Sequence, residues 1–250
     1  MNFEDKVILV TGSSRGIGKA IALSFARFGA CVCINYLHSD ADANELCQQL
    51  KLKGVKSNIY KFDVAEYDDV KIAMELIKKD FGRLDVLINN AGIAGEHAML
   101  TKDLPTISRI IDVNLKGSIN CIIGGLNLLK ETNGIIINIS SANSKSISIG
   151  GFSYAASKEG VIAMSRNMAP LLSNLGISIA SISLPLVNTD LGKWAKRRAE
   201  KSSKTIEPNE IAYEPEEIGD LVCEVCRKQV RYLNGENLVI GKKFNKQNNI

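Results

Sequence analysis

Short apolar runs alternate along the chain with longer segments that repeat apolar residues every three or four positions. The short runs are almost continuously apolar, which is typical of parallel strands buried on both faces of a sheet. The longer segments have the spacing of amphipathic helices. The predicted strands are residues 6–11, 31–36, 58–62, 84–89, 134–140 and 177–184, with a last strand through 239–241. The predicted helices are residues 19–29, 41–52, 67–81, 107–129 and 154–175. This alternation predicts an α/β fold: a single-domain, Rossmann-type doubly wound parallel sheet flanked by helices.

Length and composition fit one domain of this class. The 250 residues are 45% apolar, and we expect a single domain over residues 1–250 with a flexible tail at 242–250. The net charge of +4 is too small to indicate a nucleic-acid partner. No apolar stretch is long enough to span a membrane, and the N-terminus does not resemble a signal peptide. Six cysteines without a secretory signal then indicate a reducing compartment, so we expect a cytoplasmic protein.

Three glycines lie where the first predicted strand turns into the first predicted helix. Gly12, Gly16 and Gly18 follow the pattern Gly-x-x-x-Gly-x-Gly. Glycine lets the backbone turn sharply and approach a pyrophosphate closely, and the helix N-terminus adds N–H donors and a positive dipole. The turn therefore predicts a dinucleotide site, with an ordinary glycine-rich turn as the alternative.

The end of the second predicted strand bears on which nicotinamide dinucleotide would bind. Sites for NAD usually carry an acid there, which bonds the ribose 2′-hydroxyl. Residues 35–39 contain no acid, and the first one is Asp40. Arg15, inside the glycine turn, carries a guanidinium that suits a 2′-phosphate. We therefore expect NADP(H), with NAD(H) as the alternative.

A tyrosine and a lysine four residues apart, Tyr154 and Lys158, are expected on one face of a helix. A free tyrosine has a pKa near ~10, but a neighbouring ammonium favours the phenolate and lowers that pKa. Tyr154 could then give its proton to a carbonyl oxygen, whereas an isolated pair of this kind is more often a helix surface contact. Cys223 and Cys226 have the spacing of a metal pair, but without a second pair we expect buried thiols and no metal site.

Five segments, taken together and in order, carry a resemblance to a known family. They are Thr11–Gly18 (TGSSRGIG), Asp63-Val64, Asn89–Gly92 (NNAG), Asn114, and Ser141 with Tyr154–Lys158 (YAASK). From about residue 6 to residue 241 the chain resembles the one-domain branch of the short-chain dehydrogenase/reductase family, and among its members the 3-oxoacyl-(acyl-carrier-protein) reductases. The resemblance implies a catalytic tetrad of Asn114, Ser141, Tyr154 and Lys158. Tyr154 would be the general acid and base, Ser141 would orient the carbonyl, and Asn114 would hold a water behind Lys158.

The resemblance also implies which residues bind the cofactor. Asp63 would contact the adenine, Val64 would flank its ring, and Thr189 would contact the nicotinamide carboxamide. The implied set is Gly12, Ser14, Arg15, Gly16, Ile17, Gly18, Asn35, Asp63, Val64, Asn90, Ala91, Gly92, Tyr154, Lys158, Pro185 and Thr189.

The chain departs from the family pattern at four places. Leu186 stands where the family has glycine, in a loop that passes the nicotinamide, and a leucine enters a positive-φ conformation only at a cost. Ala180 replaces an asparagine, and Lys242 lies in a strand end that is usually Asp-Gly-Gly. Thr132 and Leu175 stand where reductases acting on acyl carrier protein have arginines, which weakens the prediction of a carrier-protein substrate.

Residues 189–212 correspond to the family's lid over the substrate. The segment carries several cations and Trp194, so it either recruits an anionic substrate beneath the tryptophan or is a solvated amphipathic helix. The resemblance further implies a small-molecule carbonyl or alcohol substrate and a homotetramer, with a dimer as the alternative.

Three functions follow from these patterns. The first is an NADP-dependent oxidoreductase that transfers hydride between the nicotinamide and a ketone or secondary alcohol. The second is a 3-oxoacyl-thioester reductase of a lipid or polyketide pathway. The third is a catalytically weak nucleotide-binding regulatory protein, which only the departures from the family pattern favour.

Overall fold

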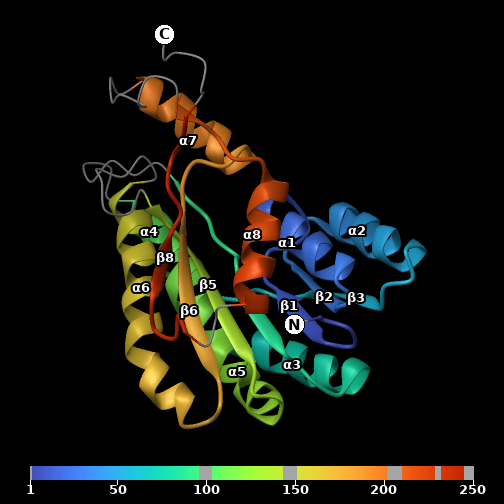
Figure 1. Ribbon diagram of the computed structural model, residues 1–250. Coiled ribbons are helices and arrows are strands. Elements are labelled where there is room, and N and C mark those ends of the chain that lie inside the picture. The colour runs from blue at the N-terminus through green and yellow to red at the C-terminus, as the bar shows by residue number, and fades with distance from the viewer. Residues whose placement is uncertain (1, 96–102, 143–150, 202–209, 229–231, 245–250) are drawn as a thin grey trace.

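A seven-stranded parallel sheet forms the centre of the molecule in a computed structural model that describes residues 2–95, 103–142, 151–201, 210–228 and 232–244. The strand order is β3-β2-β1-β4-β5-β6-β8, so the chain winds outward from β1 in both directions (Figure 1). This order confirms the predicted Rossmann-type doubly wound sheet. The strands are β1 (Val7–Val10), β2 (Cys31–Tyr36), β3 (Ser57–Lys61), β4 (Val86–Asn89), β5 (Ile135–Ser141), β6 (Ser178–Leu184) and β8 (Asn237–Val239).

Helices cover both faces of the sheet (Figure 1). On one face lie α1 (Gly16–Arg27), α2 (Asp40–Leu52) and α8 (Pro215–Lys228). On the other face lie α3 (Tyr67–Phe81), α5 (Gly117–Thr132) and α6 (Phe152–Ser173). Because every crossover returns to a parallel strand, the carboxyl ends of the strands meet at one edge of the sheet. Within the described ranges, no helix is long and apolar enough to cross a membrane.

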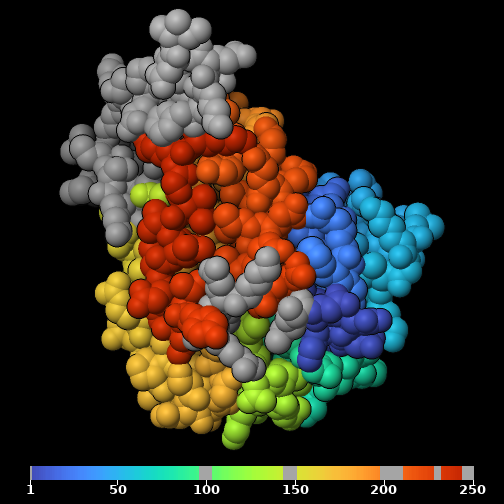
Figure 2. All heavy atoms as spheres, in the orientation of Figure 1, coloured from blue at the N-terminus to red at the C-terminus, as the bar shows by residue number. Residues whose placement is uncertain are grey.

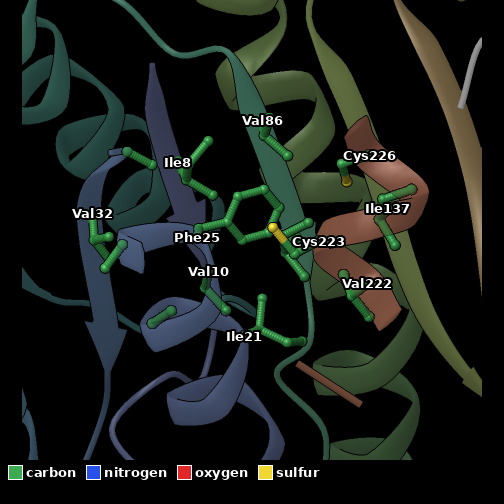
Figure 3. Packing of buried hydrophobic residues seen from close by; sticks show 14 of the residues in the cluster. Ile8, Val10, Ile21, Phe25, Val32, Val86, Ile137, Val222, Cys223 and Cys226 are labelled. Carbon is green, nitrogen blue, oxygen red and sulfur yellow. The ribbon is translucent and has the colours of Figure 1, made fainter. Parts of the chain in front are cut away.

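The core consists of one apolar layer on each face of the sheet. In the layer beneath α1 and α8, Phe25 lies between the strand residues Ile8 and Val86 and the α8 residue Cys223 (Figure 3). All six cysteines are buried and have free thiols. Cys223 and Cys226 are therefore core residues, as the sequence predicts. Figure 2 shows α8 and the C-terminal strands, in orange and red, covering this face beside the blue N-terminal elements.

The helix predicted over residues 107–129 is divided in the structure. It begins at Leu104, where Asp103 caps the first turn by accepting a hydrogen bond from Thr106 N at 3.3 Å. After α4 (Leu104–Ile111) comes a π-helical turn, η2 (Asp112–Lys116), and then α5. A π turn adds one residue to the repeat and is common at functional sites. The apolar pattern runs on through such a turn, so periodicity alone does not reveal the division.

The tail predicted to be flexible from residue 242 contains a short strand. Strand β9 (Lys243–Phe244) pairs with β7 (Glu210–Ile211) in an antiparallel ladder. Lys243 Nζ also lies 2.7 Å from a carboxylate oxygen of Glu217 and 5.2 Å from the centre of the Tyr213 ring. These partners come from a distant part of the chain, so the polar composition of the tail does not predict them. Residues 245–250 lie outside the described part of the chain.

The amino ends of β1 and β4 are held together by one buried carboxylate. Asp85 accepts hydrogen bonds from Val7 N at 3.0 Å and from two nitrogens of Arg83 at 2.6 and 2.7 Å, and Lys6 Nζ lies 3.1 Å away. Burial alone would raise the pKa of Asp85, but the hydrogen bonds from Arg83, Val7 and Lys6 outweigh it and lower that pKa. The carboxylate therefore stabilises the fold in its charged form.

We expect Asp85→Asn to lower the free energy of unfolding by about 2 kcal/mol or more, because it removes the charge that three donors share. A carboxyl whose pKa is lower in the folded chain contributes stability above the unfolded pKa of ~3.9 and loses it as the pH falls through the folded pKa. The difference from the wild type should thus be full at pH 7 and shrink below pH ~4, as measured by urea unfolding. Asp68→Asn, at an exposed ion pair, is the control and should change little. An equal loss for both variants would contradict this role.

Candidate active site

A cavity of about 500 Å³ opens at the carboxyl ends of the strands, between the glycine turn and the start of α6. Every predicted cofactor-binding residue lines it, together with Ser141, Tyr154 and Lys158. Asn114 is the one predicted catalytic residue that does not line the cavity, because it is buried behind Lys158 and only 1% exposed. Parallel topology thus brings residues from seven separate segments of the chain to one place.

The glycine turn has no room for a side chain at Gly18. A Cβ at Gly18 would lie 2.3 Å from the carbonyl oxygen of Gly12 and 2.6 Å from Asn90 Nδ2. The Asn90 amide itself donates to the carbonyls of Thr11 and Gly12, at 2.9 and 3.1 Å. Helix α1 then begins without a side-chain cap and without an acid in its first turn. Its first N–H groups are therefore suited to an anion such as a pyrophosphate, and the site fits a dinucleotide.

Asn35 acts as a brace beneath this turn. Its side chain is 2% exposed; Oδ1 accepts from Gly12 N at 2.9 Å and Nδ2 donates to Phe62 O at 3.1 Å. The residue borders the cavity, but its side-chain amide is engaged with the backbone of β3 and of the glycine turn. Its contribution to a nucleotide site is to hold the shape of the turn.

The acid nearest the end of β2 is turned away from the cavity. Asp40 accepts hydrogen bonds from Lys61 Nζ at 3.1 Å and from Tyr36 Oη at 3.2 Å, and it does not line the cavity. The hydrogen bond from Lys61 lowers the pKa of Asp40. Arg15 does line the cavity, and its guanidinium lies 2.9 Å from the carboxylate of Asp190. Arg15 thus offers a positive charge to a 2′-phosphate, although the Asp190 carboxylate competes with the phosphate for the guanidinium.

After β3, which is the neighbour of β2 in the sheet, Asp63 is held from two sides. Oδ1 accepts from Ala65 N at 2.9 Å, and Oδ2 lies 2.5 Å from a nitrogen of Arg109. Val64 packs against Gly117, where a Cβ would lie 2.6 Å from Val64 Cγ2. Arg109 lines the cavity but was not among the residues predicted from the sequence. Nothing in the local pattern distinguishes it from other basic residues on a helix, because its partner is 46 residues away.

Tyr154 and Lys158 meet in the cavity, as their spacing predicts. Lys158 Nζ lies 5.9 Å from the centre of the Tyr154 ring and donates to Ile139 O at 2.8 Å. Burial raises the pKa of Tyr154, and a hydrogen bond with Ser141 opposes this rise. Burial also lowers the pKa of Lys158 to about 8. At neutral pH the site therefore holds a protonated phenol beside a lysine that changes charge just above neutrality.

Asn114 organises the residues behind the lysine. Oδ1 accepts from Ile93 N at 2.8 Å, and Nδ2 donates to Ile93 O at 2.9 Å and to Ser157 Oγ at 3.0 Å. A Cβ at Gly92 would lie 3.3 Å from Lys158 Nζ and 3.4 Å from Asn114 Oδ1. The π-helical turn places Asn114 here, so that the loop after β4 and the catalytic helix are joined through one side chain.

The segment after β6 begins the predicted lid. Leu186 O accepts from Tyr213 N at 2.9 Å, and Leu186 is not among the described residues with a positive φ. The leucine is therefore accommodated without the strain that its position suggested. Helix α7 (Asp190–Lys201) follows, and its Trp194 lines the cavity. Residues 202–209 of the predicted lid lie outside the described part of the chain.

Lys158→Met should raise stability at neutral pH, on the order of 1–3 kcal/mol, because the wild-type fold must bury a charged ammonium. The pKa of Lys158 is about 8 in the folded chain and ~10.4 unfolded, so the penalty is full below pH 8 and fades as the pH rises toward 10. Urea unfolding at pH 7 and pH 10 measures this, with the exposed Lys130→Met as control. An advantage that stays constant between these pH values would argue against a buried charge.

The comparison with known proteins agrees with this geometry. The model of the short chain dehydrogenase family matches residues 6–200. The 3-oxoacyl-[acyl-carrier-protein] reductase of Staphylococcus aureus (strain Mu50) is 32% identical over 234 residues, which are 93% of this chain and 95% of that protein. The protein of the same name from Thermotoga maritima is 31% identical over 242 residues, 96% of this chain and 97% of its own length.

A crystal structure resembles the whole chain. It is a short chain dehydrogenase from Burkholderia cenocepacia in complex with NADP, with a TM-score of 0.86 and 29% identity, covering 96% of this chain and 98% of its own. The resemblance predicted from the motifs, including the likeness to 3-oxoacyl-(acyl-carrier-protein) reductases, is confirmed. The chain belongs to the short chain dehydrogenase family.

Proposed function

We propose that this protein is an NADP-dependent oxidoreductase that transfers hydride between the nicotinamide and a ketone or secondary alcohol. The observation that carries the proposal is that Ser141, Tyr154 and Lys158 line the same cavity as the glycine turn. A group that can protonate a carbonyl oxygen thus lies within one cavity with a backbone that can hold a pyrophosphate. Family membership supports the same class of reaction.

The chain's own residues handle the proton. Bound NADPH would supply the hydride that reduces the carbonyl carbon. Ser141 donates a hydrogen bond to the carbonyl oxygen and orients it, and Tyr154 gives its phenolic proton to that oxygen. Because burial keeps the pKa of Tyr154 above its ordinary value, the proton is present at neutral pH before substrate binds. The ammonium of Lys158 then stabilises the phenolate that remains.

Three observations favour NADP over NAD. Arg15 offers a guanidinium in the cavity, and Asp40 is held outside the cavity by Lys61 and Tyr36. The related structure from Burkholderia cenocepacia is a complex with NADP. A carboxylate at the end of β2 would repel a 2′-phosphate, and here that repulsion is removed.

Reduction of 3-oxoacyl thioesters is the second candidate, because the relatives from Staphylococcus and Thermotoga carry that activity in their names. Docking of a carrier protein through Thr132 and Leu175 is disfavoured. Thr132 Oγ1 donates to Leu84 O at 2.7 Å, and Leu175 packs against the core, so neither position presents a cation. We therefore favour one of two substrates: a free small-molecule carbonyl compound, or a thioester whose recognition does not involve Thr132 and Leu175.

A non-catalytic regulatory protein is the least supported alternative. Its basis in the sequence was the altered loop at Leu186 and the altered C-terminal strand. Leu186 adopts a backbone conformation without a positive φ, and Lys243 in the altered strand forms an ion pair with Glu217. The complete set of Asn114, Ser141, Tyr154 and Lys158 is hard to reconcile with loss of turnover.

We also propose a single domain with a lid at residues 189–212, a cytoplasmic location and a homotetramer, with a dimer as the alternative. Exposed apolar side chains on two helices support self-association: Ile123 on α5 is 49% exposed and Phe152 on α6 is 48% exposed. Symmetric association of two or more copies could bury these side chains.

Tyr154→Phe tests the proposed chemistry. It should reduce kcat for a ketone panel at least about a thousandfold, because the proton donor is lost, while fluorescence titration should still detect tight NADPH binding and weaker NADH binding. Ser153→Ala, at the buried neighbouring residue, is the matched control for changes in local packing. Retained activity in Tyr154→Phe would refute the role of the tyrosine. A wild type that binds NADPH but turns over no ketone of the panel would favour the regulatory alternative.

Asp190→Asn should tighten NADPH binding about two- to fivefold and leave NADH binding unchanged. The substitution frees Arg15 from a carboxylate 2.9 Å away, and both side chains are largely exposed, so the gain is that of a surface ion pair. The effect should shrink at high salt. Asp42→Asn, an exposed acid outside the cavity, controls for net charge. Equal tightening for both nucleotides would show that Asp190 does not compete with the 2′-phosphate.

A further inference from the structure

The ion pair between Asp63 and Arg109 is the contact at the cavity that the proposed mechanism leaves unused. The Asp63 side chain is 16% exposed and that of Arg109 39%, and 2.5 Å separates Oδ2 from the guanidinium nitrogen. Both residues line the cavity, and Asp63 follows β3, the edge strand farthest from β6 but one strand from β2 in the sheet order. The two side chains come from the end of β3 and from α4, so the pair joins two elements that are distant in sequence.

The carboxylate is fixed but not saturated. An ionised carboxylate can accept about four hydrogen bonds, two on each oxygen. Ala65 N occupies one position on Oδ1 and Arg109 occupies one on Oδ2. Two acceptor positions remain, and the residue faces the cavity. The remaining capacity suits a neutral group with N–H donors, such as an exocyclic amine on a nucleobase.

The surroundings suit a flat ring beside that carboxylate. Val64 follows Asp63, lines the cavity and is held by Gly117, whose missing Cβ leaves room for Val64 Cγ2. Asn120 Nδ2 donates to Val64 O at 2.9 Å and to Ala65 O at 3.1 Å, so the backbone after Asp63 is also fixed. Ala65 N already restrains Oδ1 of the Asp63 carboxylate, and Arg109 adds the restraint on Oδ2 that fixes the plane of the carboxylate.

Resting on the proposed function, we propose that Arg109 is a positioning residue for adenine recognition. Its guanidinium holds the Asp63 carboxylate in the rotamer whose free acceptor positions face the exocyclic amino group of the adenine. Without Arg109, the carboxylate can turn toward solvent, and the nucleotide must select one orientation on binding. We expect removal of Arg109 to reduce the selectivity of the site for nucleotides that carry the amino group, independently of any loss of folding stability.

The experiment compares NADPH with its hypoxanthine analogue, nicotinamide hypoxanthine dinucleotide phosphate, in which a carbonyl oxygen replaces the amino group. Fluorescence titration gives the Kd of both reduced nucleotides for the wild type, Arg109→Ala, Arg109→Lys and Asp63→Asn. Arg166→Ala, at an exposed arginine on α6 outside the cavity, is the control. Melting temperatures are measured alongside.

The wild type should bind NADPH more tightly than the analogue, on the order of tenfold, which is the typical value of a hydrogen bond to a charged group. Arg109→Ala should lose most of this ratio because the Kd of NADPH rises while the Kd of the analogue stays the same. Arg109→Lys should keep part of the ratio, Asp63→Asn should lose it, and Arg166→Ala should keep it in full.

Other results overturn the inference. An equal weakening of both nucleotides by Arg109→Ala would show that the arginine only supports the fold, and an unchanged ratio would show that it does not position Asp63. A wild type that binds both nucleotides without preference would exclude Asp63 as the acceptor while leaving the proposed function intact. A wild type that binds neither would overturn the proposed function and this inference together.

Discussion

The close approach of α1 to the ends of β1 and β4 is the constraint on which the site depends. At Gly18 the chain passes so near Gly12 O and Asn90 Nδ2 that a single methyl group would meet both. This contact fixes the first turn of α1 beside the cavity, where its first N–H groups have no side-chain cap. It also fixes the loop after β4, because Asn90 bonds the turn and Gly92 lies next to Lys158. The nucleotide end and the catalytic end are thus positioned by the same few backbone atoms.

At the catalytic end, polar side chains are buried in positions that do not favour folding stability. Lys158 is 5% exposed, and its ammonium donates to the carbonyl of Ile139. The fold tolerates this because Asn114, Ser157 and Ile93 form a rigid hydrogen-bonded support behind it. Burial of the lysine shifts its pKa toward the values that proton transfer requires, and it lowers the free energy of unfolding. The support that Asn114 gives to the buried lysine also accounts for the π-helical turn that contains Asn114, between the regular helices α4 and α5.

The parallel strands and the residues at their ends were predictable from the sequence because their signals are local. A buried strand is a continuous apolar run, and the glycine turn and the Tyr154–Lys158 pair are short motifs with fixed spacing. The π-helical turn was not predictable, since the apolar period continues across it. Contacts between distant segments were not predictable either: Arg15 with Asp190, Asp63 with Arg109, and Lys243 with Glu217. Each involves a charged surface residue whose partner only the tertiary fold supplies.

The base of the segment over the cavity is closed by two backbone hydrogen bonds. Asn188 N donates to Tyr213 O at 2.8 Å, and Tyr213 N donates to Leu186 O at 2.9 Å, so the chain leaves and re-enters the domain at one point. A loop that closes on itself in this way can change in length and sequence without shifting the sheet beneath it. A change of sequence within α7, whose Trp194 lines the cavity, can therefore alter the cavity wall without moving the strand that carries Ser141. The wall that faces the substrate can in this way vary while the residues at the strand ends keep their positions.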